Sequence, residues 1–243
     1  MSNKKKKIII FTSGTKDGGG SGFENLVNAT KSGILDAEIL AVISNHQNGG
    51  VREKADRLEI KFVHFPAFAT PFAQGYGGSK KATADKPASP ASQNATPDQF
   101  ATAENYRKLA KGADLVCLSG WLKLVTGLDP KKTINIHPGP LPRFGGAGMY
   151  GHHVHEAVIE AYKNGEVKNS AVSMHFVTEE YDEGPLFFSQ SVSIMPDDTA
   201  ESLAKRVNEA EHKWQPIITQ KVLSGEISWD GKDPDSLKGA VFN

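Results

Sequence analysis

Short apolar runs recur along this chain, separated by stretches with helical periodicity, and this alternation constrains the fold more than any other feature. The runs are Ile8 to Phe11, Ile39 to Ile43, Phe62 to Phe65, Leu115 to Leu118 and Ile134 to Ile136. Three of these runs, at Ile8, Ile39 and Leu115, are continuously apolar, which is typical of strands buried on both faces of a parallel sheet. We therefore predict an α/β fold in which helices cover both faces of a mostly parallel central sheet.

The intervals between the runs predict the helices. We expect them at Phe23 to Lys31, Val51 to Leu58, Thr96 to Gly112, His153 to Lys163, and from Asp198 onward. Thr96-Pro97-Asp98-Gln99 has the spacing of a capping box, and Asp198 with Glu201 predicts the start of the last helix. Pro216 should kink or divide that helix. Two strand-like runs in the C-terminal half, residues 171–177 and 186–194, predict an antiparallel addition to the sheet.

The length of 243 residues suits one large α/β domain, and we expect residues 1–243 to form a single Rossmann-like domain. The amino-acid composition changes within residues 66–98, where five of the 13 prolines occur among many glycine, alanine and serine residues. We interpret that segment as a surface insertion. Residues 231–243 are expected to form a loosely attached C-terminal tail.

Composition excludes several classes of partner. Lys plus Arg and Asp plus Glu both number 28, so no overall field favours nucleic acid or an anionic membrane. Lys4 to Lys7 precede only four apolar residues, too few for a secretion signal or a membrane span, so we expect a cytoplasmic protein. The single cysteine, Cys117, lies in an apolar run and is interpreted as a buried structural thiol.

Three polar residues suggest a catalytic site. Asn135 and His137 are two apart in a predicted strand, so they project on one side, and Pro138 ends the strand. Ligands of open α/β sheets bind where parallel strands end. An amide donor, an imidazole and the carboxylate of Asp182 can together stabilise an oxyanion and protonate a leaving nitrogen, as acyl transfer requires. Taken singly, each residue would be structural.

A glycine-rich loop follows the first predicted strand, from Thr12 to Gly22, and a helix begins near Phe23. Backbone amides of such a loop can hold a phosphate at the helix N-terminus. The loop lacks a Walker A ending, and Phe23 replaces the third glycine of the dinucleotide fingerprint, so a phosphate monoester fits better than NAD. A flexible turn is the alternative.

The histidines do not have metal-site spacing. His152, His153 and His155 cluster in sequence, but neither a His-Glu-x-x-His helix nor a second cysteine accompanies them, so we predict no metal. His155 should face the site or cap the helix start. His175, within an apolar strand, is interpreted as a buried supporting histidine.

The motifs together resemble the phosphoribosylglycinamide formyltransferases, a branch of the folate-dependent formyltransferases. The resemblance covers most of residues 7–226 and rests on these segments: Asn135-Ile136-His137-Pro138, Leu141-Pro142, His175 to Thr178, Asp182 with Gly184-Pro185, and Arg206 to His212. It implies transfer of a formyl group from 10-formyltetrahydrofolate, as co-substrate, to the amine of 5-phosphoribosylglycinamide in de novo purine biosynthesis. It also implies small-molecule substrates only, no metal, and a monomer or homodimer.

The resemblance assigns roles to individual positions. Catalysis falls to Asn135, His137 and Asp182, and the charge of Asp182 is expected to keep the His137 ring protonated near neutral pH. The ribonucleotide would be bound by Gly20, Ser21, Gly22, Phe23, Asn208 and Glu211. The folate would be bound by Leu122, Lys123, Leu124, Val125, Asn135, Thr178, Glu179, Glu180, Tyr181 and Asp182. Lys123 stands where family members often have arginine, and another family arginine is replaced around Ala103, where Lys80, Lys81 or Lys86 would substitute.

Three other functions stay open at this point. The first is another folate-dependent formyltransferase, acting on a sugar nucleotide or an initiator tRNA. The second is a formyltetrahydrofolate hydrolase, and the third is a catalytically silent nucleotide-binding module. We expect none of them, because the chain offers no basic C-terminal domain for tRNA and no room before Ile8 for a regulatory domain. Binding alone does not require the catalytic trio.

Overall fold

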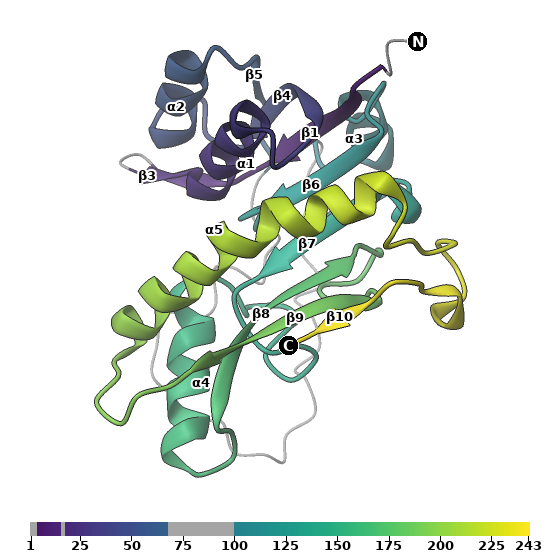
Figure 1. Cartoon of the computed structure of the whole chain (residues 1–243). Coiled ribbons are helices and arrows are strands. Elements are labelled where there is room, and N and C mark those ends of the chain that lie inside the picture. Colours follow the sequence, from purple (N-terminus) through teal and green to yellow (C-terminus); the bar gives the residue numbers. More distant parts are fainter. Residues whose placement is uncertain (1–3, 16–17, 68–99) are drawn as a thin grey trace, which may run out of the picture.

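The computed structural model describes residues 4–15, 18–67 and 100–243, and its central sheet has the strand order β10-β9-β8-β7-β6-β1-β4-β5 within those residues (Figure 1). The strands are β1 Lys6–Phe11, β4 Ala37–Ser44, β5 Phe62–His64, β6 Leu115–Ser119, β7 Thr133–His137, β8 Asn169–Phe176, β9 Leu186–Ser193 and β10 Val241–Phe242. Strands β1, β4, β5, β6 and β7 pair in parallel. Strand β8 pairs antiparallel with β7 and β9. The predicted α/β fold with an antiparallel C-terminal addition is confirmed.

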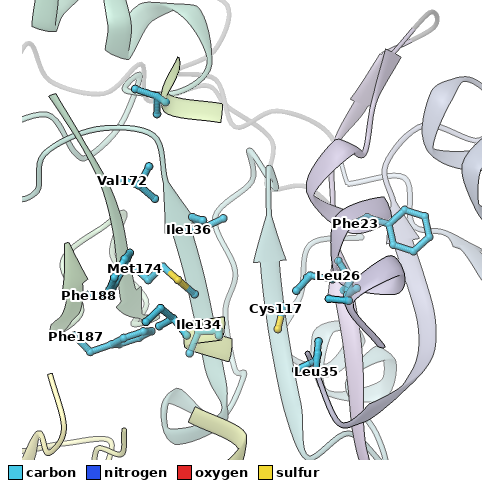
Figure 2. Packing of buried hydrophobic residues seen from close by; sticks show 14 of the residues in the cluster. Phe23, Leu26, Leu35, Cys117, Ile134, Ile136, Val172, Met174, Phe187 and Phe188 are labelled. Atoms are coloured by element: carbon cyan, nitrogen blue, oxygen red, sulfur yellow. The ribbon is translucent and has the colours of Figure 1, made fainter. Parts of the chain in front are cut away.

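Helices cover both faces of the sheet, which explains the continuously apolar strands. The helices are α1 Ser21–Ser32, α2 Gly50–Leu58, α3 Ala103–Leu109, α4 His152–Lys163 and α5 Ala200–Ser224. In β1, Ile8 and Ile10 belong to the core under α1, α2, α4 and α5, whereas Ile9 and Phe11 face the core under α3. Figure 2 shows part of the first core, where Leu26 of α1 lies near Cys117. Burial raises the pKa of the Cys117 thiol, which fits a structural role.

Two predicted helix starts differ from the structure. Helix α3 begins at Ala103, where Thr102 accepts a hydrogen bond from the Asn105 amide, and the predicted cap at residues 96–99 lies outside the described residues. Helix α5 is capped by Thr199 with Ser202, not by Asp198. The Asp198 carboxylate instead pairs with Arg206 at 2.7 Å. Apart from Pro66 and Ala67, the predicted insertion, including Lys80, Lys81 and Lys86, also lies outside the described residues.

Pro216 does not divide α5, which continues from Ala200 to Ser224. Proline has no amide hydrogen, so the carbonyl of His212 loses its usual donor four residues onward. The side chain of Asn25 in α1 donates to that carbonyl at 2.8 Å. This bond fastens α5 to α1, and Figure 1 shows the two helices on the same face of the sheet.

The C-terminal segment is attached to the sheet, so the expectation of a loose tail was wrong. Val241 and Phe242 form β10, which pairs with β9 at the edge of the sheet opposite β5 (Figure 1). The Trp229 indole is buried and donates to the Asp233 carbonyl at 2.8 Å. Within the described residues, the helices are too short or too polar to cross a membrane.

Candidate active site

A cavity of about 500 Å³ opens where β1, β6 and β7 end. Its walls are the glycine-rich loop before α1, the ends of β6 and β7, the first turn of α4 and one face of α5. A smaller cavity of about 40 Å³ adjoins it, and Trp121, Asn135, Tyr181 and Asp182 line both. This is the carboxyl edge of the parallel strands, where open α/β sheets bind ligands.

Asn135, His137 and Asp182 meet at the wall between the two cavities. Ile134 and Ile136 belong to the hydrophobic core, as the alternation along β7 predicts. Asp182, in the loop between β8 and β9, bridges the other two. Its Oδ2 lies 3.6 Å from His137 Nδ1, and its Oδ1 accepts from Asn135 Nδ2 at 3.3 Å.

The loop that carries Asp182 has an unusual backbone. Asp182 has φ of 57°, a left-handed conformation that Asp and Asn tolerate better than most residues. The Gly146 amide donates to its Oδ2 at 3.0 Å. A side chain at Gly184 would lie 1.7 Å from the Phe176 carbonyl oxygen, so only glycine fits there. The backbone therefore fixes where the carboxylate points.

The neutral form of the His137 ring is more strongly favoured than we expected. Its Nε2 faces the Phe144 carbonyl at 2.7 Å, and because a carbonyl only accepts, Nε2 carries the proton. Burial lowers the pKa of His137 and outweighs the opposing effect of the Asp182 charge. The expectation that Asp182 keeps this ring protonated near neutral pH was therefore wrong. The lone pair of neutral His137 lies at Nδ1, on the side of Asp182.

His175 supports the site from β8, where it pairs in register with Asn135. Its Nδ1 donates to the Phe176 carbonyl at 2.8 Å, so the Nε2 of the neutral ring accepts from Asn135 Nδ2 at 3.0 Å. Burial raises the pKa of Asp182, but its contacts with the rings of His175 and His137 and the hydrogen bond from the Gly146 amide outweigh burial and hold that pKa below its ordinary value. The structure thus gives the site an ionised carboxylate between two imidazoles.

The glycine-rich loop leads into α1, and the N-terminus of that helix lies at the large cavity. It includes a short hairpin of β2 Gly14–Thr15 and β3 Gly18–Gly19, and Gly20 at the helix N-cap has φ of 74°. No side chain among the described residues caps this helix. Amides of the first helical turn have no partner within a helix and attract anions. Gly20, Ser21 and Gly22 line the cavity, whereas the Phe23 side chain is fully buried in the core (Figure 2) and has only its amide to offer.

One face of α5 supplies polar groups to the same cavity. Asn208 and Glu211 both line it, and Asn208 Nδ2 donates to Glu211 Oε2 at 3.3 Å. Burial raises the pKa of Glu211 to about 7, although the Asn208 bond opposes this. Gln215 also lines the cavity and donates to Ser119 at 3.0 Å, a pair that our sequence reasoning missed. Its position four residues after Glu211 was the available signal, because that spacing repeats one helix face.

The predicted folate residues divide between the two cavities. Leu122 lines the larger one, while the smaller one is lined by Lys123, Leu124, Val125, Thr178, Glu180, Tyr181 and Asp182. Glu179 lines neither cavity. Its carboxylate accepts from Thr126 Oγ1 and from the Gly127 amide, both at 3.2 Å, and so fastens the Asp182 loop to the segment after β6.

The three neighbouring histidines of α4 are placed differently from one another. His152 and His153 are near the Glu156 carboxylate, at 3.5 and 3.3 Å, and His153 does not line the cavity. His155 lines the cavity and lies beyond the N-cap Gly151, so it faces the site rather than capping the helix. Across residues 4–15, 18–67 and 100–243, no cluster of three His, Cys, Asp or Glu side chains is arranged to hold a metal.

Comparisons with known proteins point in one direction. A family model described as formyl transferase matches residues 6–219. A chloroplastic phosphoribosylglycinamide formyltransferase of Arabidopsis thaliana is 31% identical over 230 residues, covering 93% of this chain and 68% of that protein. The Bacillus subtilis phosphoribosylglycinamide formyltransferase is 29% identical, covering 90% and 95%. The crystal structure of phosphoribosylglycinamide formyltransferase from Bacillus halodurans superposes with a TM-score of 0.67 at 27% identity, covering 90% of this chain and 96% of that one.

Proposed function

The chain belongs to the formyl transferase family, and we propose that it transfers a formyl group from 10-formyltetrahydrofolate to the amine of 5-phosphoribosylglycinamide in purine biosynthesis. One observation carries this proposal. The Asp182 carboxylate contacts both Asn135 and His137 at the edge of a cavity whose other end is a helix N-terminus without a side-chain cap in the described residues. Such a cavity offers a phosphate site and acyl-transfer chemistry together.

Asn135 would stabilise the charge that develops during attack. The amine nitrogen bonds to the formyl carbon, and the carbonyl electron pair moves to oxygen to give a tetrahedral oxyanion. One N–H of Asn135 donates to His175. The other makes the longer 3.3 Å contact to Asp182, and the oxyanion can take the place of Asp182 as its acceptor. Loss of one such donor typically costs about 2.7 to 4 kcal/mol of transition-state stabilisation.

His137 would carry the proton that the reaction must move. The attacking amine loses a proton, and the folate nitrogen needs one when its bond to the formyl carbon breaks. Neutral His137 can accept the proton at Nδ1, directly or through a water, and Asp182 then stabilises the imidazolium. Return of that proton to the departing nitrogen restores the neutral ring and releases tetrahydrofolate.

The substrates would enter from opposite sides of the trio. The ribonucleotide phosphate would bind the amides of Ser21, Gly22 and Phe23, and Asn208 with Glu211 would hold the ribose or the glycinamide. The pterin would enter by the smaller cavity, beside Lys123 to Val125 and the Thr178 to Tyr181 loop. In this arrangement the formyl carbon and the amine meet at the wall that Asn135 and Asp182 share.

The test is an assay of tetrahydrofolate release with 10-formyltetrahydrofolate, in the presence and absence of phosphoribosylglycinamide. We expect release only when the ribonucleotide is present. Release without it would identify a hydrolase, and no release under either condition would identify a silent binding module.

A further inference from the structure

Buried polar atoms without a hydrogen-bond partner concentrate at the large cavity. Among the described residues, six buried side-chain nitrogen or oxygen atoms lack a partner. Three of them belong to cavity-lining side chains: Trp121 Nε1, His155 Nδ1 and His212 Nε2. Because native structures pair nearly all buried polar groups, such a concentration indicates that a ligand completes the bonding.

His155 is the clearest of the three. Its side chain is 5% exposed, and it extends from the first turn of α4 into the cavity. The residue on its N-terminal side, Val154, is fully buried in the core, which fixes the helix and therefore the direction of the His155 ring. A structural histidine in this position would be expected to bond to the chain, as His137 does to Phe144 and His175 does to Phe176.

The charge state of His155 suits hydrogen bonding rather than proton transfer. Burial, together with the nearby rings of His152 and His137, lowers the pKa of His155 to about 4. The imidazole is therefore neutral at physiological pH and offers one N–H donor and one nitrogen acceptor. Such a weak base is a poor acceptor for the proton of the attacking amine.

The position of His155 identifies which part of the substrate it meets. It lines the cavity that contains Glu211 and Asn208 of α5, and it does not line the smaller cavity of the proposed pterin site. It also lies near His137, close enough for the two rings to interact electrostatically. In the proposed binding mode, the ligand segment between the α5 face and the catalytic trio would be the glycinamide arm, whose amide has one acceptor and one donor.

We propose that His155 binds the substrate by hydrogen bonding to the glycinamide amide of the ribonucleotide, and so holds the amine toward Asn135 and His137. This inference rests on the proposed function of the cavity. It adds a binding group from α4 to those on the glycine-rich loop and α5, and it assigns a ligand to the buried Nδ1 of His155, which has no partner among the described residues.

Replacement of His155 by phenylalanine tests the inference, because phenylalanine keeps the ring and removes both nitrogens. We expect His155→Phe to unfold at the same or a higher temperature, since an unpaired buried polar group is removed. Its Kd for phosphoribosylglycinamide should rise about tenfold. The Kd for the folate should stay within about twofold. His155→Gln, which retains a donor and an acceptor, should recover part of the affinity for the ribonucleotide.

His153→Phe is the matched control. His153 lies on the same helix outside the cavity, and phenylalanine preserves its edge contact with Tyr150, so neither Kd should change. The inference is overturned if His155→Phe binds the ribonucleotide as tightly as the wild type, or if it loses affinity for both ligands together with thermal stability. Failure of the wild type itself to bind the ribonucleotide would overturn both this inference and the proposed function.

Discussion

The Asp182 carboxylate lies 3.6 Å from Nδ1 of His137, and the left-handed backbone of Asp182, with φ of 57°, directs it there. The opposite ring nitrogen of His137, Nε2, donates a hydrogen bond to the Phe144 carbonyl. The ring can therefore take up a proton only on the side that faces the carboxylate. This geometry links proton uptake by His137 to the ionisation of Asp182.

Asp182→Asn should lower kcat about 100-fold or more while changing folate binding little, because it removes the charge that stabilises protonated His137. Asparagine tolerates the left-handed backbone, so the loop should keep its shape. Steady-state kinetics with each substrate varied separately will distinguish the effect on kcat from an effect on KM.

Glu183→Gln is the control for that variant, since Glu183 is an exposed carboxylate next to Asp182 and lines neither cavity. It should leave kcat within a few-fold of the wild-type value. A kcat that is equal for Asp182→Asn and for the wild type across the pH range would remove Asp182 from the mechanism.

Glu211 should make the protein less stable as pH rises. Burial raises the pKa of Glu211 to about 7 from an ordinary 4.5, so between these values the native chain holds a proton that the unfolded chain releases. The contribution to stability is full below the lower value and is lost as pH rises through the higher one. Glu211→Gln should remove this loss, as urea unfolding at about pH 5 and about pH 7.5 will measure.

Glu209→Gln provides the comparison for the unfolding experiment, because Glu209 is an exposed carboxylate on the same helix. That variant should retain the wild-type difference in unfolding free energy between the two pH values. An equal difference in wild type and Glu211→Gln would show that Glu211 has an ordinary pKa in the native state.

Gly22→Ala should destabilise the protein, because the added methyl group would collide with the hydroxyl oxygen of Ser119. The added Cβ would lie 2.2 Å from Ser119 Oγ, and overpacking of this kind costs about 1 to 3 kcal/mol. Ser119→Ala removes that oxygen, while the Ser119 Cβ would lie at an ordinary 3.5 Å from the new methyl group. In the Ser119→Ala background, Gly22→Ala should therefore cost much less. Equal costs in both backgrounds, measured by chemical denaturation, would contradict the packing described around the glycine-rich loop.

Asn25→Ala should cost about 1 kcal/mol of folding free energy, because the His212 carbonyl loses its donor. In a Pro216→Ala background, residue 216 regains an amide that can bond this carbonyl, so the same change should cost less. A double-mutant cycle of unfolding free energies measures the coupling. No coupling would mean that α1 and α5 are held together by other contacts.

Patterns with strong periodicity predicted the fold well. The runs at Ile8, Ile39 and Leu115 were predictable as parallel strands, because both their faces are buried and no polar residue interrupts them. Strand β10 has only two residues, too few for any periodic signal. The start of α5 was misplaced because Asp198 and Thr199 are both good caps, and only the distant Arg206 decides between them.

The clustering of Asn135, His137 and Asp182 was predictable from sequence, but the electrostatics of the cluster were not. Residue type and spacing indicated Asn135, His137 and Asp182. The pKa of His137 depends on how deeply the folded chain buries the ring, which no local pattern records. The unpaired nitrogen of His155 and the bond between Gln215 and Ser119 likewise arise only when helices and strands distant in sequence pack together.

Transfer of an isotopically labelled formyl group tests the central claim most directly. The wild-type protein is mixed with labelled 10-formyltetrahydrofolate and phosphoribosylglycinamide, and the products are separated by mass spectrometry. We predict that the label appears on the glycinamide amine of the ribonucleotide, and that Asp182→Asn transfers it far more slowly. Recovery of the label as free formate, with the ribonucleotide unchanged, would contradict the account.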